Sequence, residues 1–212
     1  MTRFSLLFLL LFAVACGKDG SQNETSGNSA PEDSYQTITS DDPLPALAET
    51  FKINITYVNF TPDQRLKYEK AVEIVKKVIG SEEFKNKVLT HTYNDVATYV
   101  DNNGKSNSTI YQQVLNGNET LQPSRNNQMD VEVELYYAET TTVGYTYANS
   151  KRIWVNTKYF NAYTPASVAG NLFHEWVHKL GYTHATSYSV SRDYSVPYAL
   201  GRMMSTMGRQ YE

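Results

Sequence analysis

Residues 174–184 read HEWVHKLGYTH and contain three of the four histidines in the chain. On an α-helix, His174 and His178 lie on the same face, one turn apart, and can direct two imidazole nitrogens at one ion. His184 can join them only if the helix stops in between, and Gly181 tolerates the left-handed conformation that such a stop requires. The spacing therefore predicts a helix that ends at a three-histidine metal site.

The residue types in this window indicate zinc chemistry. Imidazole nitrogen is a preferred ligand of zinc, and catalytic zinc sites keep one position open for water. Glu175 follows the first histidine and can take a proton from a water molecule in that position. We therefore expect one catalytic Zn²⁺, held by His174, His178 and His184, with Glu175 as general base. An amphipathic helix with surface histidines and a zinc site without activity are the alternatives.

Length and composition fit a single globular domain with appended segments. The chain has 212 residues, of which 41% are hydrophobic and 19% charged. Its formal net charge is -3 and no stripe of basic residues is present, so nucleic acid is not an expected partner. The 17 tyrosines suit core and rim packing, or a surface that binds peptides or sugars. We expect a monomer.

The first 45 residues predict export and membrane attachment. Arg3 precedes an apolar run over residues 4–15, which is too short to span a bilayer and fits a signal peptide. The small residues before Cys16 resemble a bacterial lipobox, although Ala13 stands where leucine is commonest. Ordinary signal cleavage nearby is the alternative. Cys16 is the only cysteine, so a disulfide scaffold is excluded.

These features divide the chain into three parts. We expect a lipoprotein signal peptide over residues 1–15, a flexible tether over residues 16–45 and a globular domain with the histidine motif over residues 46–212. Lipidation of Cys16 would anchor the domain to a membrane. The expected location is the bacterial cell envelope, outside the cytoplasm.

Hydrophobic periodicity outlines the domain. Alternation predicts strands at residues 51–57, 88–93, 131–137, 143–147 and 152–155, the last two joined by a turn at Asn149-Ser150. Thr61-Pro62 and Thr164-Pro165 predict the starts of two helices, of which the first ends at Gly80 and the second carries the histidines. A last helix is expected from about Pro197, and residues 94–128 are expected to form long loops. The apolar helix faces are predicted to contain Leu66, Ala71, Ile74, Val75 and Val78, then Val168, Leu172, Trp176 and Leu180, and finally Leu200, Met203, Met204 and Met207.

With these elements in this order, the chain resembles the metzincin clan of zinc endopeptidases. The motif at residues 174–184 matches the signature of the clan, including its third histidine. Residues 55–63 are similar to the first strand and helix of matrix-metalloproteinase-like domains, and residues 143–148 with 152–156 to their substrate-binding edge strand and its neighbour. The resemblance covers residues 51–208. It implies an α+β, zincin-like fold: a twisted mixed sheet of about four to five strands, an active-site helix and a C-terminal helix.

The resemblance also implies an activity. The chain would be an endopeptidase that hydrolyses peptide bonds by metal-activated water, with His174, His178 and His184 as zinc ligands and Glu175 as base. An extended polypeptide substrate would pair with the open edge strand. The residues expected to line it are Gly144, Tyr145, Thr146 and Tyr147. A non-catalytic peptide-binding lipoprotein and a cell-wall peptide hydrolase are the alternatives.

Two departures from the clan pattern stand out. Pro197 stands where the clan places a methionine beneath the zinc, within Ser195-Val196-Pro197-Tyr198, and it can also simply begin the last helix. Tyr198 is a candidate to reach the metal or to stabilise an oxyanion. A loop for structural zinc or calcium is not apparent, and His91 is interpreted as a packing or surface residue.

Overall fold

The computed structural model describes residues 51–123 and 127–212. The predicted signal peptide over residues 1–15, Cys16 and the tether over residues 16–45 lie outside the described residues. Within the described ranges no helix is both long and apolar enough to cross a membrane. The strands are β1 (Lys52–Val58), β2 (Gln128–Tyr136), β3 (Gly144–Thr146) and β4 (Arg152–Asn156). The α-helices are α1 (Pro62–Ile79), α2 (Glu82–Leu89), α3 (Asn107–Asn116), α4 (Thr157–Phe160), α5 (Pro165–Lys179) and α6 (Val196–Gly208).

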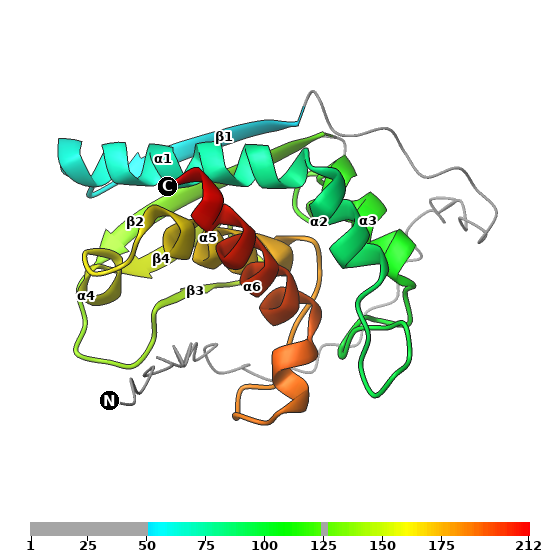
Figure 1. Cartoon of the computed structure of the whole chain (residues 1–212). Coiled ribbons are helices and arrows are strands. Elements are labelled where there is room, and N and C mark those ends of the chain that lie inside the picture. The colour runs from blue at the N-terminus through cyan, green and yellow to red at the C-terminus, as the bar shows by residue number, and fades with distance from the viewer. Residues whose placement is uncertain (1–50, 124–126) are drawn as a thin grey trace, which may run out of the picture.

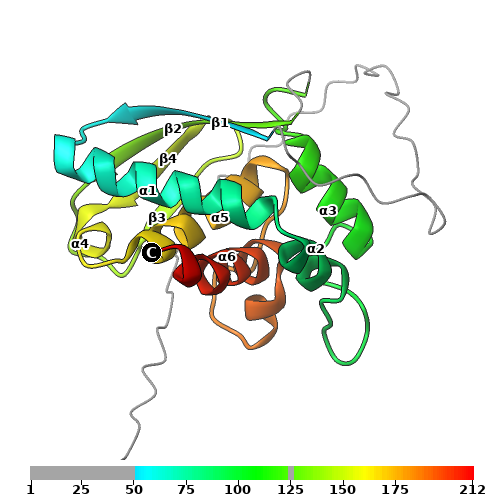
Figure 2. The same ribbon diagram turned by 45° about the horizontal axis from the view of Figure 1, so that its top comes forward.

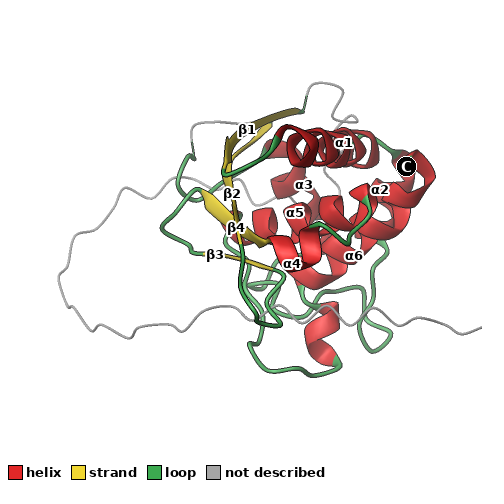
Figure 3. Cartoon of the chain, turned by 90° about the vertical axis from the view of Figure 1, so that its left-hand side faces the viewer, coloured by secondary structure: helices red, strands yellow, loops and turns green. Residues whose placement is uncertain are grey.

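The strands form one open mixed sheet in the order β1-β2-β4-β3. β1 pairs with β2 in parallel, with Ile55 beside Val131, and β2 pairs with β4 in parallel. β3 pairs antiparallel with β4 and forms one edge of the sheet. The long helices pack on one side of the sheet (Figure 3), so the described part of the chain is a sheet layer and a helix layer. The predicted α+β class is confirmed.

The first strand and helix follow the sequence pattern closely. β1 occupies the predicted position, and Thr61 caps α1, because its hydroxyl accepts a hydrogen bond from Gln64 N at 3.3 Å. The Gln64 side chain in turn accepts from Thr61 N at 3.0 Å, which completes a capping box. Gly80 ends the helix as predicted. Leu66 was expected in the core, but it is 60% exposed; the rest of the predicted stripe is buried.

The segment between α1 and β2 contradicts two expectations. Residues 88–93 do not form a strand, because Ser81 caps α2, whose buried face includes Val88. Residues 94–128 are not only loops, because α3 begins after the Ser106 cap and ends at Gly117, which has φ +58°. Figures 1 and 2 place α2 and α3 at the end of the molecule away from α4.

The predicted hairpin is confirmed. β3 and β4 are joined by a turn in which Ser150 N donates to Tyr147 O at 3.2 Å. Tyr145 lies opposite Trp154, and their rings stack with centroids 5.1 Å apart. β2 is also confirmed, with Val131, Val133 and Leu135 buried, whereas Tyr137 follows the strand and is 65% exposed.

Helix α5 is the central element of the helix layer. It packs against α6 and α1, and it also contacts β3 and β4 (Figure 1). Thr164 caps it with Pro165 at its start, as predicted. The predicted core faces of α5 and α6 are confirmed, with Met203 only partly buried; the buried members are Val168, Leu172, Trp176, Leu180, Leu200, Met204 and Met207.

α5 and α6 approach each other almost backbone to backbone. A Cβ atom added at Gly170 would lie 2.6 Å from Ser205 Cβ and 2.9 Å from Gly201 O. A Cβ atom added at Gly201 would lie 2.9 Å from His174 Cβ. The two glycines therefore allow α6 to rest directly against the first histidine of the motif.

We expect Gly201→Ala to destabilise the fold by about 1–3 kcal/mol, because the new methyl group must displace His174 or the α6 backbone. If the histidine motif binds zinc as predicted, its affinity should fall as well. Thermal unfolding followed by circular dichroism, with and without zinc, measures both effects. Gly80→Ala is the matched control, because its added Cβ would lie no closer than 3.4 Å to a neighbour. Equal effects of the two variants would contradict the role given to the helix contact.

Candidate metal centre

The three predicted ligands meet at the end of α5. His174 and His178 lie one turn apart on the helix, which stops at Lys179. Gly181 then takes φ +90°, the left-handed conformation predicted for it, and the chain turns back to bring His184 beside the helix. One potential ligand atom from each histidine lies within 4.8 Å of the others, and the Nε2 atoms of His174 and His184 are 3.2 Å apart.

Main-chain carbonyl groups orient two of the three rings. His178 Nδ1 lies 2.7 Å from Tyr182 O, and His184 Nδ1 lies 3.0 Å from Ala185 O. A proton on Nδ1 satisfies each carbonyl and leaves Nε2 with its lone pair toward the cluster, as in protein zinc sites. Two of the three imidazoles are thus held by main-chain carbonyl groups of the turn that follows the helix.

Burial keeps the cluster neutral. It lowers the pKa of His174 well below its usual range and that of His178 to about 4, and the neighbouring histidines add to both effects. The pKa of His184 is lowered too, again mainly by burial. A metal ion binds only the unprotonated ring, so the cluster is ready to accept one at neutral pH. Among the described residues, His178 Nε2 is buried without a hydrogen-bond partner, which a metal ion would satisfy.

Glu175 is buried beside the cluster. Its side chain is 0% exposed, and the Asn171 side chain lies close enough to its carboxylate to favour the ionised form. Burial raises the pKa of Glu175 to about 8, and the charge of Lys179 opposes that rise. A dication held by the histidines would favour the ionised carboxylate, because opposite charges stabilise each other at short range. The three histidines therefore fit a metal ion, and Glu175 is a buried carboxyl group within the same turn of α5.

Tyr198 lies against two of the predicted metal ligands. Its ring centroid is 4.7 Å from that of His174 and 4.6 Å from that of His184. The residue belongs to the first turn of α6, where Pro197 is the second residue, so the interpretation of Pro197 as a helix start is confirmed. The Arg192 guanidinium lies over the Tyr198 ring at 4.8 Å. Whether the Tyr198 hydroxyl stabilises an oxyanion stays a prediction.

The other candidate residues have clear positions. His91 lies outside the cluster and stacks on Tyr99, with ring centroids 4.1 Å apart, which agrees with a packing role. In the described part of the chain, the histidine triad is the one group of three or more potential metal ligands. Gly144, Tyr145 and Thr146 form the edge strand β3, and Tyr147 follows it with 45% exposure. Their contact with a substrate stays a prediction.

Sequence reasoning missed two buried charged side chains next to the centre. Lys179 follows the ligand His178 and is only 3% exposed, with its amine directed at the β3–β4 hairpin. Its place inside the motif was the available signal. Glu119 accepts hydrogen bonds from Trp176 Nε1 at 2.7 Å and from Asp130 N at 2.8 Å. The polar sequence around Glu119 gave no indication of these two hydrogen bonds.

Removing the Glu119 carboxylate should destabilise the fold. We expect Glu119→Ala to lower the free energy of unfolding by about 2–5 kcal/mol, because the indole and amide donors of Trp176 and Asp130 would lose their acceptor. Glu119→Gln keeps an acceptor and is the control. Urea denaturation measures both, and equal stability of the alanine variant and the parent would contradict this assignment.

The parent and Glu119→Gln should also differ in how their stability depends on pH. Burial raises the pKa of Glu119 above its usual value of 4.5, and its hydrogen bonds oppose that rise only in part. A group with a raised folded pKa contributes stability at low pH and loses it as the pH rises through that pKa. The parent should therefore lose stability relative to Glu119→Gln as the pH rises from 4.5.

The described structure thus defines an α+β domain with a histidine cluster that could hold a metal ion. Comparisons with protein-family models, curated proteins and solved structures found no match to this chain. Any assignment of its activity therefore depends on the motif and on the geometry of the site.

Proposed function

We propose that this protein is a zinc-dependent endopeptidase with a zincin-like fold, similar to the metzincins. The observation that carries the proposal is the convergence of His174, His178 and His184 where α5 ends at the Gly181 turn. Three neutral imidazoles suit Zn²⁺ and leave a coordination position open. Glu175, within the same helix turn, supplies the acid–base group that hydrolysis needs.

In the proposed reaction, Glu175 and Tyr198 have separate roles beside the metal ion. Zinc, when bound, supplies a Lewis acid and lowers the pKa of a water ligand. The Glu175 carboxylate accepts a proton from the attacking water and returns it to the leaving amine. Burial of this carboxylate excludes competing solvent, which strengthens its interaction with the water. The Tyr198 hydroxyl, next to two of the ligands, is a candidate donor to the developing oxyanion.

An extended polypeptide is the substrate that the sheet can best accept. β3 is an edge strand in contact with α5, so its open side can pair with a peptide near the metal centre. The predicted lipid anchor on Cys16 would hold the enzyme outside the cytoplasm in the bacterial cell envelope. The substrate would then be a protein or peptide of that compartment.

Cleavage of a mixed peptide library, with the protein stripped of metal and then reloaded with Zn²⁺, tests the proposal. We expect no cleavage by the stripped protein and internal cleavage after reloading. Zinc binding without cleavage of any peptide would favour the non-catalytic alternative. Cleavage confined to peptidoglycan peptides added to the same assay would favour the cell-wall alternative.

A further inference from the structure

One side chain connects the metal centre to the edge strand. Lys179 directly follows the ligand His178 at the end of α5. Its Nζ atom lies 3.1 Å from Tyr147 O and 3.2 Å from Arg152 O, and it also contacts Ser150 O and Thr146 Oγ1 closely. All four oxygens belong to residues 146–152, which form the turn between β3 and β4 and the residues beside it.

The burial of this amine is unusual for a lysine. Lysine side chains normally extend their charged end into water, because a buried ammonium loses much hydration energy. Lys179 is 3% exposed, and its three N–H groups are surrounded by oxygen acceptors that replace water. The Thr146 hydroxyl also donates to Arg152 O at 2.7 Å, so the two strands and the lysine share one hydrogen-bond network.

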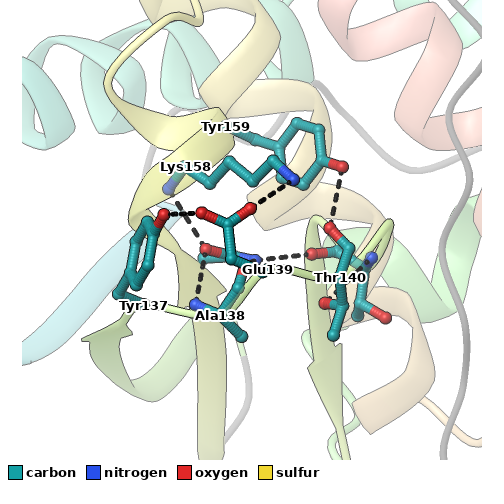
Figure 4. Close-up of polar contacts among 8 residues, drawn as sticks. Tyr137, Ala138, Glu139, Thr140, Lys158 and Tyr159 are labelled. Carbon is teal, nitrogen blue, oxygen red and sulfur yellow. Dashed lines mark hydrogen bonds and ion pairs between the residues drawn. The ribbon is translucent and has the colours of Figure 1, made fainter.

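Different contacts hold the two ends of the β3–β4 hairpin, namely the start of β3 and the turn between the strands. Before β3, the Asn156 side chain donates to Ala138 O at 2.8 Å and to Thr142 O at 3.2 Å. In the same loop Lys158 Nζ lies 3.1 Å from Glu139 Oε2, and the Tyr159 hydroxyl donates to Thr140 O at 2.9 Å (Figure 4). These contacts tie the start of β3 to β4 and α4. Lys179 ties the other end of the hairpin to the helix that carries the metal ligands.

We propose that Lys179 is a positioning residue that fixes the edge strand β3 relative to the histidine cluster and so sets the placement of an extended peptide over the metal. The inference rests on the proposed peptidase function. β3 has three residues and, within the part of the chain that the structure describes, pairs on one side only, with β4. A peptide bound along it reaches the metal in line only while the strand keeps its place against α5, and a misplacement of about 1 Å can cost about 10²-fold in rate.

Substrate length provides the test. In zinc-loaded Lys179→Met, we expect kcat/KM to fall about 10- to 100-fold for a long peptide that spans β3. For the same sequence cut to one residue on each side of the scissile bond, the change should be about threefold or less, because that substrate needs only the metal and Glu175. A change in the ionisation of Glu175 would instead slow both substrates equally. Lys76→Met, which removes a surface lysine paired with Glu73, is the control.

A second measurement does not depend on activity. Hydrogen exchange of residues 144–152 should become at least about tenfold faster in Lys179→Met, with β1 and α6 unchanged. If that variant folds poorly, Thr146→Val should give the same pattern with smaller changes. Equal losses on long and short substrates, or unchanged exchange in the hairpin of both variants, would overturn the role of Lys179. An inactive zinc-loaded parent would instead overturn the proposed function.

Discussion

Replacing Glu175 with glutamine is expected to lower kcat/KM for peptide cleavage by about 10²–10⁴-fold, the usual contribution of a general acid–base group. Glutamine has nearly the same shape but cannot take a proton from water. Zinc content should stay at the level of the parent, since the histidine ligands and the carbonyls that orient them are unchanged. Cleavage rates and metal analysis of the same preparations measure the two quantities.

The fold of this variant should not suffer. Burial raises the pKa of Glu175 to about 8 in the metal-free protein, so the parent loses stability as the pH rises from 4.5 through that value. A neutral amide avoids this loss, and metal-free Glu175→Gln should unfold at the same or a higher temperature than the parent. Glu73→Gln, an exposed carboxylate paired with Lys76, is the control for activity. Equal turnover in Glu175→Gln and the parent would exclude Glu175 as the base.

Replacing His184 with alanine is expected to weaken zinc binding by at least about 100-fold. Loss of a group that only hydrogen-bonds a ligand costs about 10- to 100-fold in metal affinity, and a direct ligand contributes more. His174 and His178 would remain on α5, but two imidazoles leave the ion with too few protein ligands for a stable catalytic site. Competition with a chromophoric chelator gives the affinity, and peptide cleavage should fall with metal occupancy.

His91→Ala is the matched control for this experiment. His91 is the one histidine outside the motif, and it packs on Tyr99 away from the cluster. Its loss should leave zinc affinity unchanged, although it can lower thermal stability. Unchanged zinc affinity in His184→Ala would contradict the assignment of the third ligand and with it the proposed function.

Local signals made much of this structure predictable. The threonine-proline pairs at Thr61 and Thr164 fixed the starts of α1 and α5, because caps act within one turn of helix. The three ligands could be inferred because all lie within eleven residues, and helix geometry with one glycine determines how they meet. The strands β2 and β4 could be predicted because burial of one face of the sheet gives each strand an alternating hydrophobic pattern.

The errors arose where local patterns competed. Residues 88–93 have strand-like composition, but α2, which begins after the Ser81 cap, includes Val88 and Leu89 and ends at Thr90. α3 was missed because polar residues dominate its sequence, although Ile110, Tyr111, Val114 and Leu115 lie at helical spacing and are buried. Lys179 and Glu119 could not be placed, because their partners lie in distant segments that only the tertiary fold brings near.

The chain has two tryptophans, and the fold puts them in the two places that matter for the proposed activity. Trp176 lies inside the histidine motif, buried against Phe51 and Phe173, whereas Trp154 stacks on Tyr145 in the hairpin. The intrinsic fluorescence of each tryptophan therefore reports on a different part of the molecule. Changing one indole at a time to phenylalanine would separate the emission of the helix with the histidine cluster from that of the strand beside it, with no dye attached.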